Sequence, residues 1–347
     1  MDFNLSCPIP INEYPIITMA HGSGGVLSHH LVQKMFQVAF GNEMLSEGHD
    51  GAAFSVTSGR LAYTTDSFVV NPVFFPGANI GDLAVNGTIN DLVCCGAKPL
   101  YLSAGFILEE GLLMEDLWKV VVSMKNSAER GGVKIITGDT KVVDRGKGDK
   151  IFINTSGIGV IPEGINISPR NTTSGDRIIL SGRIGDHGVA VMSARSGLEF
   201  ETTVISDTTA LNGLADKIFG TTKNIHVLRD PTRGGVATTL NELCQSAGVG
   251  MIIEEEKIPV SEEVKGACEI LGLDPLYIAN EGKLVLIVPE EEAEKVVEAM
   301  REHPDGYESS IIGRVTAEHP GIVRMTTSIG SSRIIDMLTG DQLPRIC

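Results

Sequence analysis

The sequence predicts two α/β-type domains followed by a short C-terminal tail. Its 347 residues suffice for two hydrophobic cores of ordinary size. Segments typical of strands alternate with segments typical of helices through both halves of the chain. This pattern is interrupted at Ile161-Pro162-Glu163-Gly164, where proline and glycine favour a turn. We therefore expect domains over residues 1–163 and 164–337, and a mobile tail over 338–347.

In the first half, a glycine-rich segment precedes a helix whose apolar positions Leu27, Leu31, Met35 and Val38 follow the helical repeat. Further along, the pattern predicts strands over 60–66, 101–108, 133–137 and 151–160, and helices over 80–95 and 114–130. We expect glycines to interrupt the helix over 80–95.

In the second half, predicted strands and helices alternate again after the break. Strands are expected over 176–181, 225–228, 251–254, 283–288 and 310–315, with a last strand that ends near Leu338. Helices are expected within 182–196, from 235 to about 247, near 261–271 and over 290–301. The run of acids from Glu290 to Glu294 is most simply the solvated face of a helix.

The composition argues against nucleic acid and membrane as partners. A formal net charge of −16 opposes association with nucleic acid or with an anionic membrane surface. No apolar run approaches the length of a membrane span. The N-terminal Met1-Asp2-Phe3-Asn4 lacks the basic and apolar regions of a signal peptide, so we expect a cytoplasmic protein.

The six cysteines do not predict a zinc site, because no Cys-x-x-Cys pair or Cys/His cluster is present. Cys94 and Cys95 lie in an apolar stretch, and Cys244 and Cys268 lie in predicted helical regions. We expect these four thiols to be buried packing groups.

Cys347 differs from the others because it is the last residue and no later residue can bury it. Its thiolate would be a strong, soft nucleophile. The ten residues from Leu338 onward reach about 30 Å when extended, and Pro344 favours an extended approach. The tail is therefore either a frayed end or an arm that carries a reactive thiol between an internal pocket and a partner protein.

Four aspartates follow or lead predicted apolar segments, namely Asp50, Asp66, Asp91 and Asp139. We place them where strands end, several beside glycine or other small residues that permit close backbone approach. Mg²⁺ prefers oxygen ligands and commonly combines carboxylates with waters and phosphate oxygens. The pattern of four predicts an Mg²⁺–nucleotide site near the glycine-rich loop, although each aspartate alone is more simply a turn or N-cap residue.

The second-half segment Arg229-Asp230-Pro231-Thr232-Arg233-Gly234-Gly235 is rich in residues that bind phosphate and metal. Aspartate can ligate a metal, arginine can grip phosphate, and Gly-Gly can open a helix N-terminus. A sharp strand-to-helix turn is the structural alternative. The usual nucleotide fingerprints are missing: Leu27 occupies the position of the third glycine in a Rossmann turn, and no P-loop is present.

Seven segments, in order along the chain, together resemble one known family. They are Gly22-Ser23-Gly24-Gly25, Thr65-Asp66, Asn90-Asp91, Gly138-Asp139-Thr140-Lys141-Val142-Val143, Asp230-Pro231-Thr232-Arg233-Gly234-Gly235, Asn280-Glu281-Gly282-Lys283 and Pro344-Arg345-Ile346-Cys347. They resemble the HypE family of carbamoyl dehydratases, which act in maturation of nickel–iron hydrogenase within the PurM-like, AIR synthetase-related superfamily. The resemblance implies a two-domain PurM-like fold: a mixed-sheet N-terminal domain that dimerises into a barrel, and an α+β C-terminal domain.

The resemblance also implies a reaction and partners. A carbamoyltransferase, HypF, would load a carbamoyl group onto Cys347. ATP-dependent dehydration would convert it to a thiocyanate, and an iron-carrying HypC–HypD complex would accept the cyanide. A homodimer, ATP and Mg²⁺ are implied with it.

The family pattern assigns roles to residues of this chain. Metal ligands would be Asp50, Asp91, Asp139 and Asp230; nucleotide contacts would come from Gly22, Ser23, Gly24, Gly25, Asp66, Gly138, Thr140 and Arg233; and the catalytic residues would be Cys347, Lys141 and Glu281. Lys141 would neutralise charge on the transferred phosphoryl group, and Glu281 would act as the base. Asp50 follows His49, whereas superfamily members often carry adjacent acids there, which leaves the number of metal ions open.

Two alternatives remain at this point. One is a purine-pathway or selenophosphate-type ATP-dependent synthetase, which would not need the terminal cysteine. The other is a scaffold whose tail docks a partner without catalysis. Magnesium-dependent ATP turnover that requires a carbamoylated tail would separate the enzyme from the scaffold.

Overall fold

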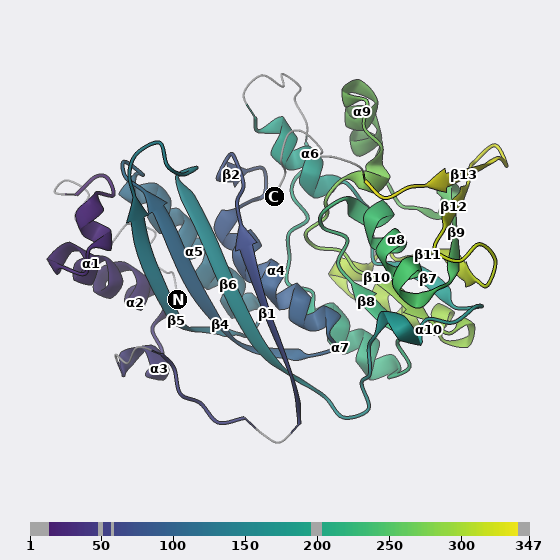
Figure 1. The fold of residues 1–347 in the computed structure, drawn as a ribbon, viewed down its shortest axis with the longest axis horizontal. Helices are drawn as coiled ribbons and strands as arrows, with labels where there is room; N and C mark the ends of the chain where they lie inside the picture. Colours follow the sequence, from purple (N-terminus) through teal and green to yellow (C-terminus); the bar gives the residue numbers. More distant parts are fainter. Residues whose placement is uncertain (1–13, 48–50, 57–58, 196–202, 339–347) are drawn as a thin grey trace.

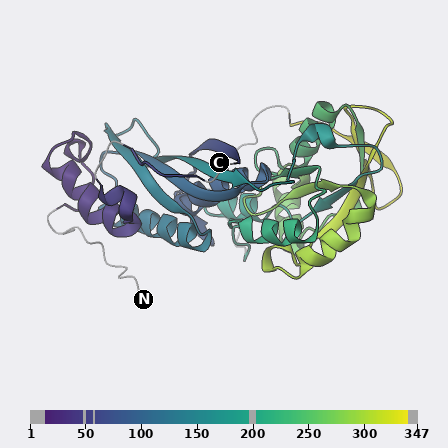
Figure 2. The same cartoon turned by 90° about the horizontal axis from the view of Figure 1, so that it is seen from below.

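The computed structural model describes residues 14–47, 51–56, 59–195 and 203–338. The molecule is elongated, with an N-terminal half and a C-terminal half that lie side by side along the long axis (Figure 1, Figure 2). Each half is built around its own sheet. The predicted α/β fold class is confirmed.

The N-terminal half contains a four-stranded mixed sheet in the order β1-β6-β4-β5. Its strands are β1 (Arg60–Phe68), β4 (Lys98–Glu109), β5 (Lys134–Val143) and β6 (Ile151–Ile161). The β4–β5 pair is parallel and the other pairs are antiparallel. Strands β1 and β5 are therefore the two edges of this sheet.

Helices α4 (Ile80–Cys94) and α5 (Met114–Arg130) cover one face of this sheet (Figure 1). The other face carries exposed apolar side chains in the alternation of a half-buried sheet. Tyr63 is 70% exposed, and Leu61 and Ile107 are 46% and 44% exposed. This half thus presents an open, partly apolar sheet face.

Shorter elements complete the N-terminal half. The chain enters through η1 (Met19–Gly22), then α1 (Val26–Leu31), a π-helical turn η2 (Val32–Phe36), α2 (Gln37–Phe40) and α3 (Glu43–Ser46), and a small hairpin pairs β2 (Phe74–Phe75) with β3 (Ala78–Asn79). This N-terminal helical region lies at the β5 end of the molecule (Figure 1).

The C-terminal half contains a seven-stranded sheet in the order β13-β12-β9-β11-β7-β10-β8. The strands are β7 (Arg177–Leu180), β8 (Val227–Arg229), β9 (Gly250–Glu254), β10 (Val285–Val288), β11 (Ser310–Thr316), β12 (Val323–Thr326) and β13 (Ser332–Ile335). The helices are α6 (Asp186–Ser193), α7 (Asn212–Thr221), α8 (Gly235–Ala247), α9 (Glu262–Leu271) and α10 (Glu290–Arg301). Short 3-10 turns are η3 (Pro169–Asn171), η4 (Glu255–Lys257), η5 (Pro275–Tyr277) and η6 (Pro304–Gly306).

Several predicted elements differ from the observed ones. Helix α4 runs without interruption, because Gly81 and Gly87 are sites of close packing and not breaks. Strand β5 continues to Val143, where the prediction ended at residue 137. Helix α7 and the β12–β13 hairpin were not predicted, and the last strand ends at Ile335 and not near Leu338.

The positions of Asp91 and Asp139 also correct the sequence interpretation. Asp91 lies on helix α4, and Asp139 lies inside strand β5, so neither stands at the end of a strand. Asp66 lies two residues before the end of β1. The family segment Gly138-Asp139-Thr140-Lys141 is thus extended edge-strand backbone.

The turn into α8 requires glycine at two successive positions. Gly234 and Gly235 have φ of +71° and +61°, in the left-handed region. A Cβ at Gly235 would lie 2.5 Å from the Leu276 carbonyl oxygen and 2.6 Å from that of Ile278. The absence of a side chain at Gly235 therefore lets this turn pack directly against the backbone of residues 276–278.

We expect Gly235→Ala to lower the free energy of unfolding by roughly 3 kcal/mol, because left-handed strain adds to overpacking against backbone. Gly248→Ala is the matched control, since φ there is +68° but no atom lies within 4 Å of the added Cβ. It should cost only about 1 kcal/mol in urea unfolding. Equal costs would show that the contacts with residues 276 and 278 are unimportant.

Candidate active site

One face of helix α4 forms the junction between the two halves of the molecule (Figure 1). The N-cap of this helix is Asn79, whose Oδ1 accepts a hydrogen bond from the Gly81 N–H at 2.8 Å. Asn86 and Asn90 are four residues apart, as are Gly87 and Asp91, so each pair projects on a common side. This side is hydrogen-bonded to Thr208, Thr209, Leu211 and Glu281 of the C-terminal half.

Three aspartates from separate elements come near one another beside this helix face. Asp91 Oδ2 accepts a hydrogen bond from Thr64 Oγ1 of β1 at 2.7 Å. Asp230 directly follows β8, and the Cys94 thiol donates to its Oδ1 at 3.7 Å. Asp66 of β1 lies 3.7 Å from the Arg233 guanidinium. We call Asp66, Asp91 and Asp230 the acidic cluster.

The acidic cluster holds its protons more tightly than exposed carboxylates do. Burial, reinforced by the nearby charge of Asp230, raises the pKa of Asp91 to about 6, although the Thr64 hydrogen bond opposes this. Burial also raises the pKa of Asp230, with Arg229 acting in the opposite direction. Burial raises the pKa of Asp66 against the Ser67 N–H and Arg233. Nearby positive charges therefore do not fully compensate the burial of these three carboxylates.

A hard divalent cation fits this deficit, because Mg²⁺ binds carboxylate oxygens and completes its shell with waters and phosphate oxygens. Within the described ranges, however, no three acidic, histidine or cysteine side chains close on a metal by themselves. The acidic cluster could contribute Asp91 and Asp230 as ligands, with the remaining positions filled by other groups. Asp50, another of the four predicted metal ligands, lies outside the described residues.

Arg233 lies in the turn that leads into α8, two residues before the helix begins. Its side chain is 79% exposed, and its contact with Asp66 is the ion pair described above. The left-handed Gly234 caps the N-terminus of the 13-residue helix α8. The exposed Arg233 guanidinium thus lies beside the carboxylates of the acidic cluster, an arrangement that suits the binding of a metal-bound phosphate.

The other predicted nucleotide residues gather at strand β5. A Cβ at Gly22 would lie 2.6 Å from the Val142 backbone nitrogen, so the glycine-rich loop packs directly on this strand. Gly24 has φ of +80°, and its N–H donates to Ser28 Oγ at 2.9 Å. Lys141 Nζ lies 3.4 Å from an Asp139 carboxylate oxygen, and both side chains are mostly exposed. We call Gly22–Gly25 and Gly138–Lys141 the β5 edge.

Within one chain, the β5 edge and the acidic cluster lie at opposite sides of the sheet. Ser67 pairs with Asn154, Asn154 with Gly105, and Gly105 with Asp139. Three strand spacings separate β1 from β5, which amounts to about 14 Å. The predicted convergence of Asp66 and Asp91 with Asp139 does not occur within the single chain.

Glu281 is buried at the junction between the halves, with 5% of its surface exposed. A Cβ at Gly87 would lie 3.9 Å from Glu281 Oε2, so the carboxylate lies over the face of α4. The Glu281 N–H donates to Asp207 Oδ1 at 3.0 Å, and its carbonyl accepts from Asn90 Nδ2 at 3.1 Å. Sequence reasoning found Glu281 but missed Asp207, which no periodic pattern or recognised segment marked.

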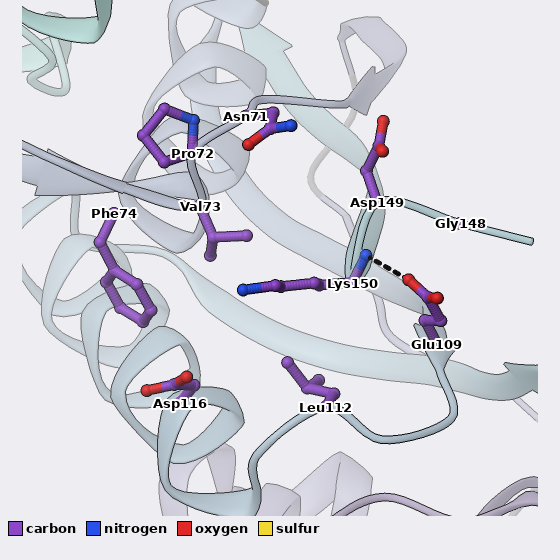
Figure 3. Close-up of a pocket in the computed structure, with 10 residues that line it drawn as sticks. All are labelled: Asn71, Pro72, Val73, Phe74, Glu109, Leu112, Asp116, Gly148, Asp149 and Lys150. Atoms are coloured by element: carbon purple, nitrogen blue, oxygen red, sulfur yellow. Dashed lines mark hydrogen bonds between the residues drawn. The ribbon is translucent and has the colours of Figure 1, made fainter. Parts of the chain in front are cut away.

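A cavity of about 390 Å³ lies elsewhere, between the β2 region, the start of α5 and the β5–β6 loop (Figure 3). Its ten lining residues are Asn71, Pro72, Val73, Phe74, Glu109, Leu112, Asp116, Gly148, Asp149 and Lys150. The Lys150 side chain points across it, while the Lys150 N–H donates to Glu109 at 3.0 Å. None of the predicted site residues lines this cavity.

The cysteines agree only in part with their predicted packing role. Cys244 and Cys268 are buried as predicted, but Cys95 is exposed and Cys94 is half-buried beside Asp230. The predicted nucleophile Cys347 and residues 339–347 of the tail lie outside the described residues. In the part of the chain that is described, no helix has the length and apolar character needed to cross a membrane.

Comparison with known proteins identifies the class. Residues 48–161 match the N-terminal domain model of AIR synthase related proteins, and residues 173–326 match the C-terminal domain model. The chain belongs to the AIR synthase related family.

Individual relatives within that class narrow the family further. Carbamoyl dehydratase HypE of Azotobacter vinelandii is 53% identical over 331 residues, which cover 95% of this chain and 97% of that protein. A crystal structure of the hydrogenase maturation protein HypE in complex with ATP is 49% identical, with a TM-score of 0.91 over 95% of this chain and 99% of that one. HypE in a HypE–HypF complex is 51% identical, with a TM-score of 0.78 over 89% and 99% of the two chains. Within the AIR synthase related class, the chain is a member of the HypE family of carbamoyl dehydratases.

Proposed function

We propose that this chain carries out ATP-dependent dehydration of a carbamoyl group on Cys347 to a protein thiocyanate, which supplies cyanide ligands for the iron of nickel–iron hydrogenase. The chain matches a carbamoyl dehydratase over 95% of its length. The observation that carries the proposal is the group of neighbouring carboxylates in the acidic cluster, which lies beside Arg233. That arrangement suits a phosphoryl transfer supported by metal.

The chemistry balances in two steps. The carbamoyl oxygen attacks the γ-phosphorus of ATP and ADP leaves, which turns a poor leaving group into a phosphate ester. Loss of the N–H protons then forms the carbon–nitrogen triple bond as the carbon–oxygen bond breaks and phosphate departs with the carbamoyl oxygen. The products are the thiocyanate on Cys347, ADP, phosphate and a proton. Sulfur suits this role because it can later release cyanide to a thiophilic iron.

The residues divide into metal, phosphate and proton-handling groups. Asp91 and Asp230, with Asp50 and Asp139, would hold Mg²⁺, which would neutralise phosphate charge when bound. Lys141 would neutralise charge on the transferred phosphoryl group, and Glu281 would accept carbamoyl protons from its buried position. The remaining nucleotide contacts would come from Asp66, Gly22, Ser23, Gly24, Gly25, Gly138, Thr140 and Arg233.

A homodimer would bring together the acidic cluster and the β5 edge, which lie apart within one chain. The acidic cluster and the β5 edge lie on opposite edges of one sheet, so a second copy can bring its β5 edge to the acidic cluster of the first. The exposed Leu61, Tyr63 and Ile107 give the sheet an apolar face for such a partner. Two such sheets would close a barrel, with the ATP site near the interface between them.

The same proposal assigns the parts of the chain and their partners. Residues 1–163 would form the ATP-binding domain, 164–337 the second domain, and 338–347 the arm that carries Cys347. HypF would supply the carbamoyl group, as the HypE–HypF complex of a relative supports, and an iron-carrying HypC–HypD complex would accept cyanide. The reaction would take place in the cytoplasm.

Intact mass spectrometry tests the proposed reaction directly. The chain is carbamoylated by its transferase, and its mass is measured before and after MgATP is added. We expect a gain of one carbamoyl group on Cys347, then a loss of one water. A stable adduct in the presence of bound MgATP would contradict the dehydratase proposal, and failure to form any adduct would favour a small-molecule synthetase.

A further inference from the structure

The main chain of Glu281 is fixed from both halves of the molecule. Asn90 of α4 holds its carbonyl at 3.1 Å, and Asp207 holds its N–H at 3.0 Å. A Cβ on the next residue, Gly282, would lie 1.8 Å from the Asp207 carbonyl oxygen, so the two segments are in direct backbone contact. Glu281 is therefore held in one place by a carboxylate that is remote in sequence.

Asp207 is a buried charge paired with the partly buried Lys283. Its side chain is 4% exposed, and its second oxygen lies 3.1 Å from Lys283 Nζ, itself 13% exposed. Lys283 also donates to the Gly282 carbonyl at 3.2 Å. Burial opposes ionisation of Asp207, but Lys283, His187 and the Glu281 N–H outweigh burial and lower its pKa. The pair thus holds the main chain at two successive residues, with Asp207 on the Glu281 N–H and Lys283 on the Gly282 carbonyl.

We propose that Asp207 and Lys283 form a positioning ion pair, which fixes the place of Glu281 and the electrostatic environment of its carboxylate during dehydration. This inference rests on the proposed role of Glu281 as base. Removing one partner would leave an unpaired buried charge next to Glu281, and such a charge acts strongly at short range in a dry site.

Other titratable groups lie near the same region. They are Asp186 and His187 of α6, which act electrostatically on Asp207, and Asp91 of α4, which follows the Asn90 that contacts Glu281. Burial raises the pKa of Asp186 to about 6, assisted by Asp207 and opposed by Lys283. Burial lowers the pKa of His187 to about 4, so this histidine is neutral near pH 7. Asp207 and Lys283 contact the main chain at Glu281 and Gly282. Both can be substituted without changing a residue of the acidic cluster.

The two single substitutions make opposite predictions. Lys283→Met leaves the negative Asp207 unpaired, so the acid limb of the dehydration rate should move to higher pH. Asp207→Asn leaves the positive Lys283 unpaired, so the limb should move to lower pH, while asparagine Oδ1 can still accept the Glu281 N–H. We expect shifts of about one pH unit. The double variant Asp207→Asn/Lys283→Met removes both charges and should return the limb toward that of the wild type.

The assay is single-turnover conversion of the carbamoylated full-length chain with saturating MgATP, followed by intact mass over a pH series. Asp176→Asn is the matched control, because Asp176 is also 4% exposed and holds His226 Nδ1 at 2.7 Å in the same half. It should change stability without moving the acid limb. The inference would be overturned if both single variants and the double variant lost rate while the acid limb of each pH profile stayed at the wild-type pH. Structural damage alone would lower the rate in that way.

Glu281→Gln separates this inference from the proposal beneath it. Full dehydration by Glu281→Gln would refute Glu281 as base, and with it the inference. If Glu281→Gln stops dehydration and the two single variants shift in opposite directions, both statements hold. If Glu281→Gln stops dehydration but the single variants keep the wild-type limb, only the ion-pair inference fails.

Discussion

Cys347→Ala is expected to abolish thiocyanate formation while leaving MgATP binding unchanged. The variant removes the atom that would carry the carbamoyl group, yet changes no residue of the acidic cluster or of the β5 edge. Intact mass should show no carbamoyl adduct after incubation with the transferase. Calorimetric titration with MgATP should give the wild-type affinity in the same preparation.

Two further variants make the role of the sulfur specific. Cys347→Ser keeps a hydroxyl of similar size but is a far weaker nucleophile near pH 7, so it should remain unloaded. Cys95→Ser is the control, because Cys95 is an exposed thiol on the surface of the folded chain. It should be carbamoylated and dehydrated like the wild type. Loss of MgATP binding in a folded Cys347→Ala chain would contradict the separation of tail and nucleotide site.

The helices that the sequence predicted well are those with one apolar face. Met114–Arg130 and Glu290–Arg301 match their predicted limits, because apolar residues repeat along one side of each and charges fill the other. Helix α4 lies between the sheet and the C-terminal half and is buried on most sides. Its sequence therefore lacks an amphipathic pattern, and its glycines suggested breaks where the structure uses them for close packing.

The site was predictable as a set of residues but not as an arrangement. Asp66, Asp91 and Asp230 stand out as acids beside apolar segments, and the structure brings them together. The location of Asp139 on the far edge strand depends on strand order, which local sequence does not encode. Asp207 acts through a hydrogen bond between segments 74 residues apart, and such contacts leave no periodic signal.

Asp91→Asn is expected to stop ATP-dependent dehydration and yet stabilise the metal-free protein. Asp91 would ligate Mg²⁺, and even residues that merely support a metal ligand contribute roughly 10- to 100-fold. The rate should therefore fall by more than about a hundredfold. In the absence of Mg²⁺, the substitution removes a half-buried negative charge that lies near Asp230 and Asp66. Its neutral amide should raise the free energy of unfolding at pH 7 by on the order of 1 kcal/mol.

The sign of the pH dependence follows from the raised pKa. Because the pKa of Asp91 is about 6 in the folded chain and 3.8 by itself, the folded state binds more protons between these values. Ionisation of Asp91 therefore costs stability above pH 6, and this cost disappears as the pH falls toward 4. The stability advantage of Asp91→Asn over the wild type should be full at pH 7 and vanish near pH 4.

Thermal unfolding of both proteins with and without MgATP measures these effects together. Mg²⁺ with ATP should raise the melting temperature of the wild type, since a ligand that binds the folded state stabilises it. It should raise that of Asp91→Asn far less. Glu298→Gln, on the exposed side of α10, is the control and should leave both the MgATP response and the pH dependence unchanged. If Asp91→Asn instead lowers stability at pH 7, the Thr64 hydrogen bond at 2.7 Å outweighs the repulsion within the acidic cluster. The acidic cluster would then be stable without a cation, and the reason for assigning it to Mg²⁺ would be lost.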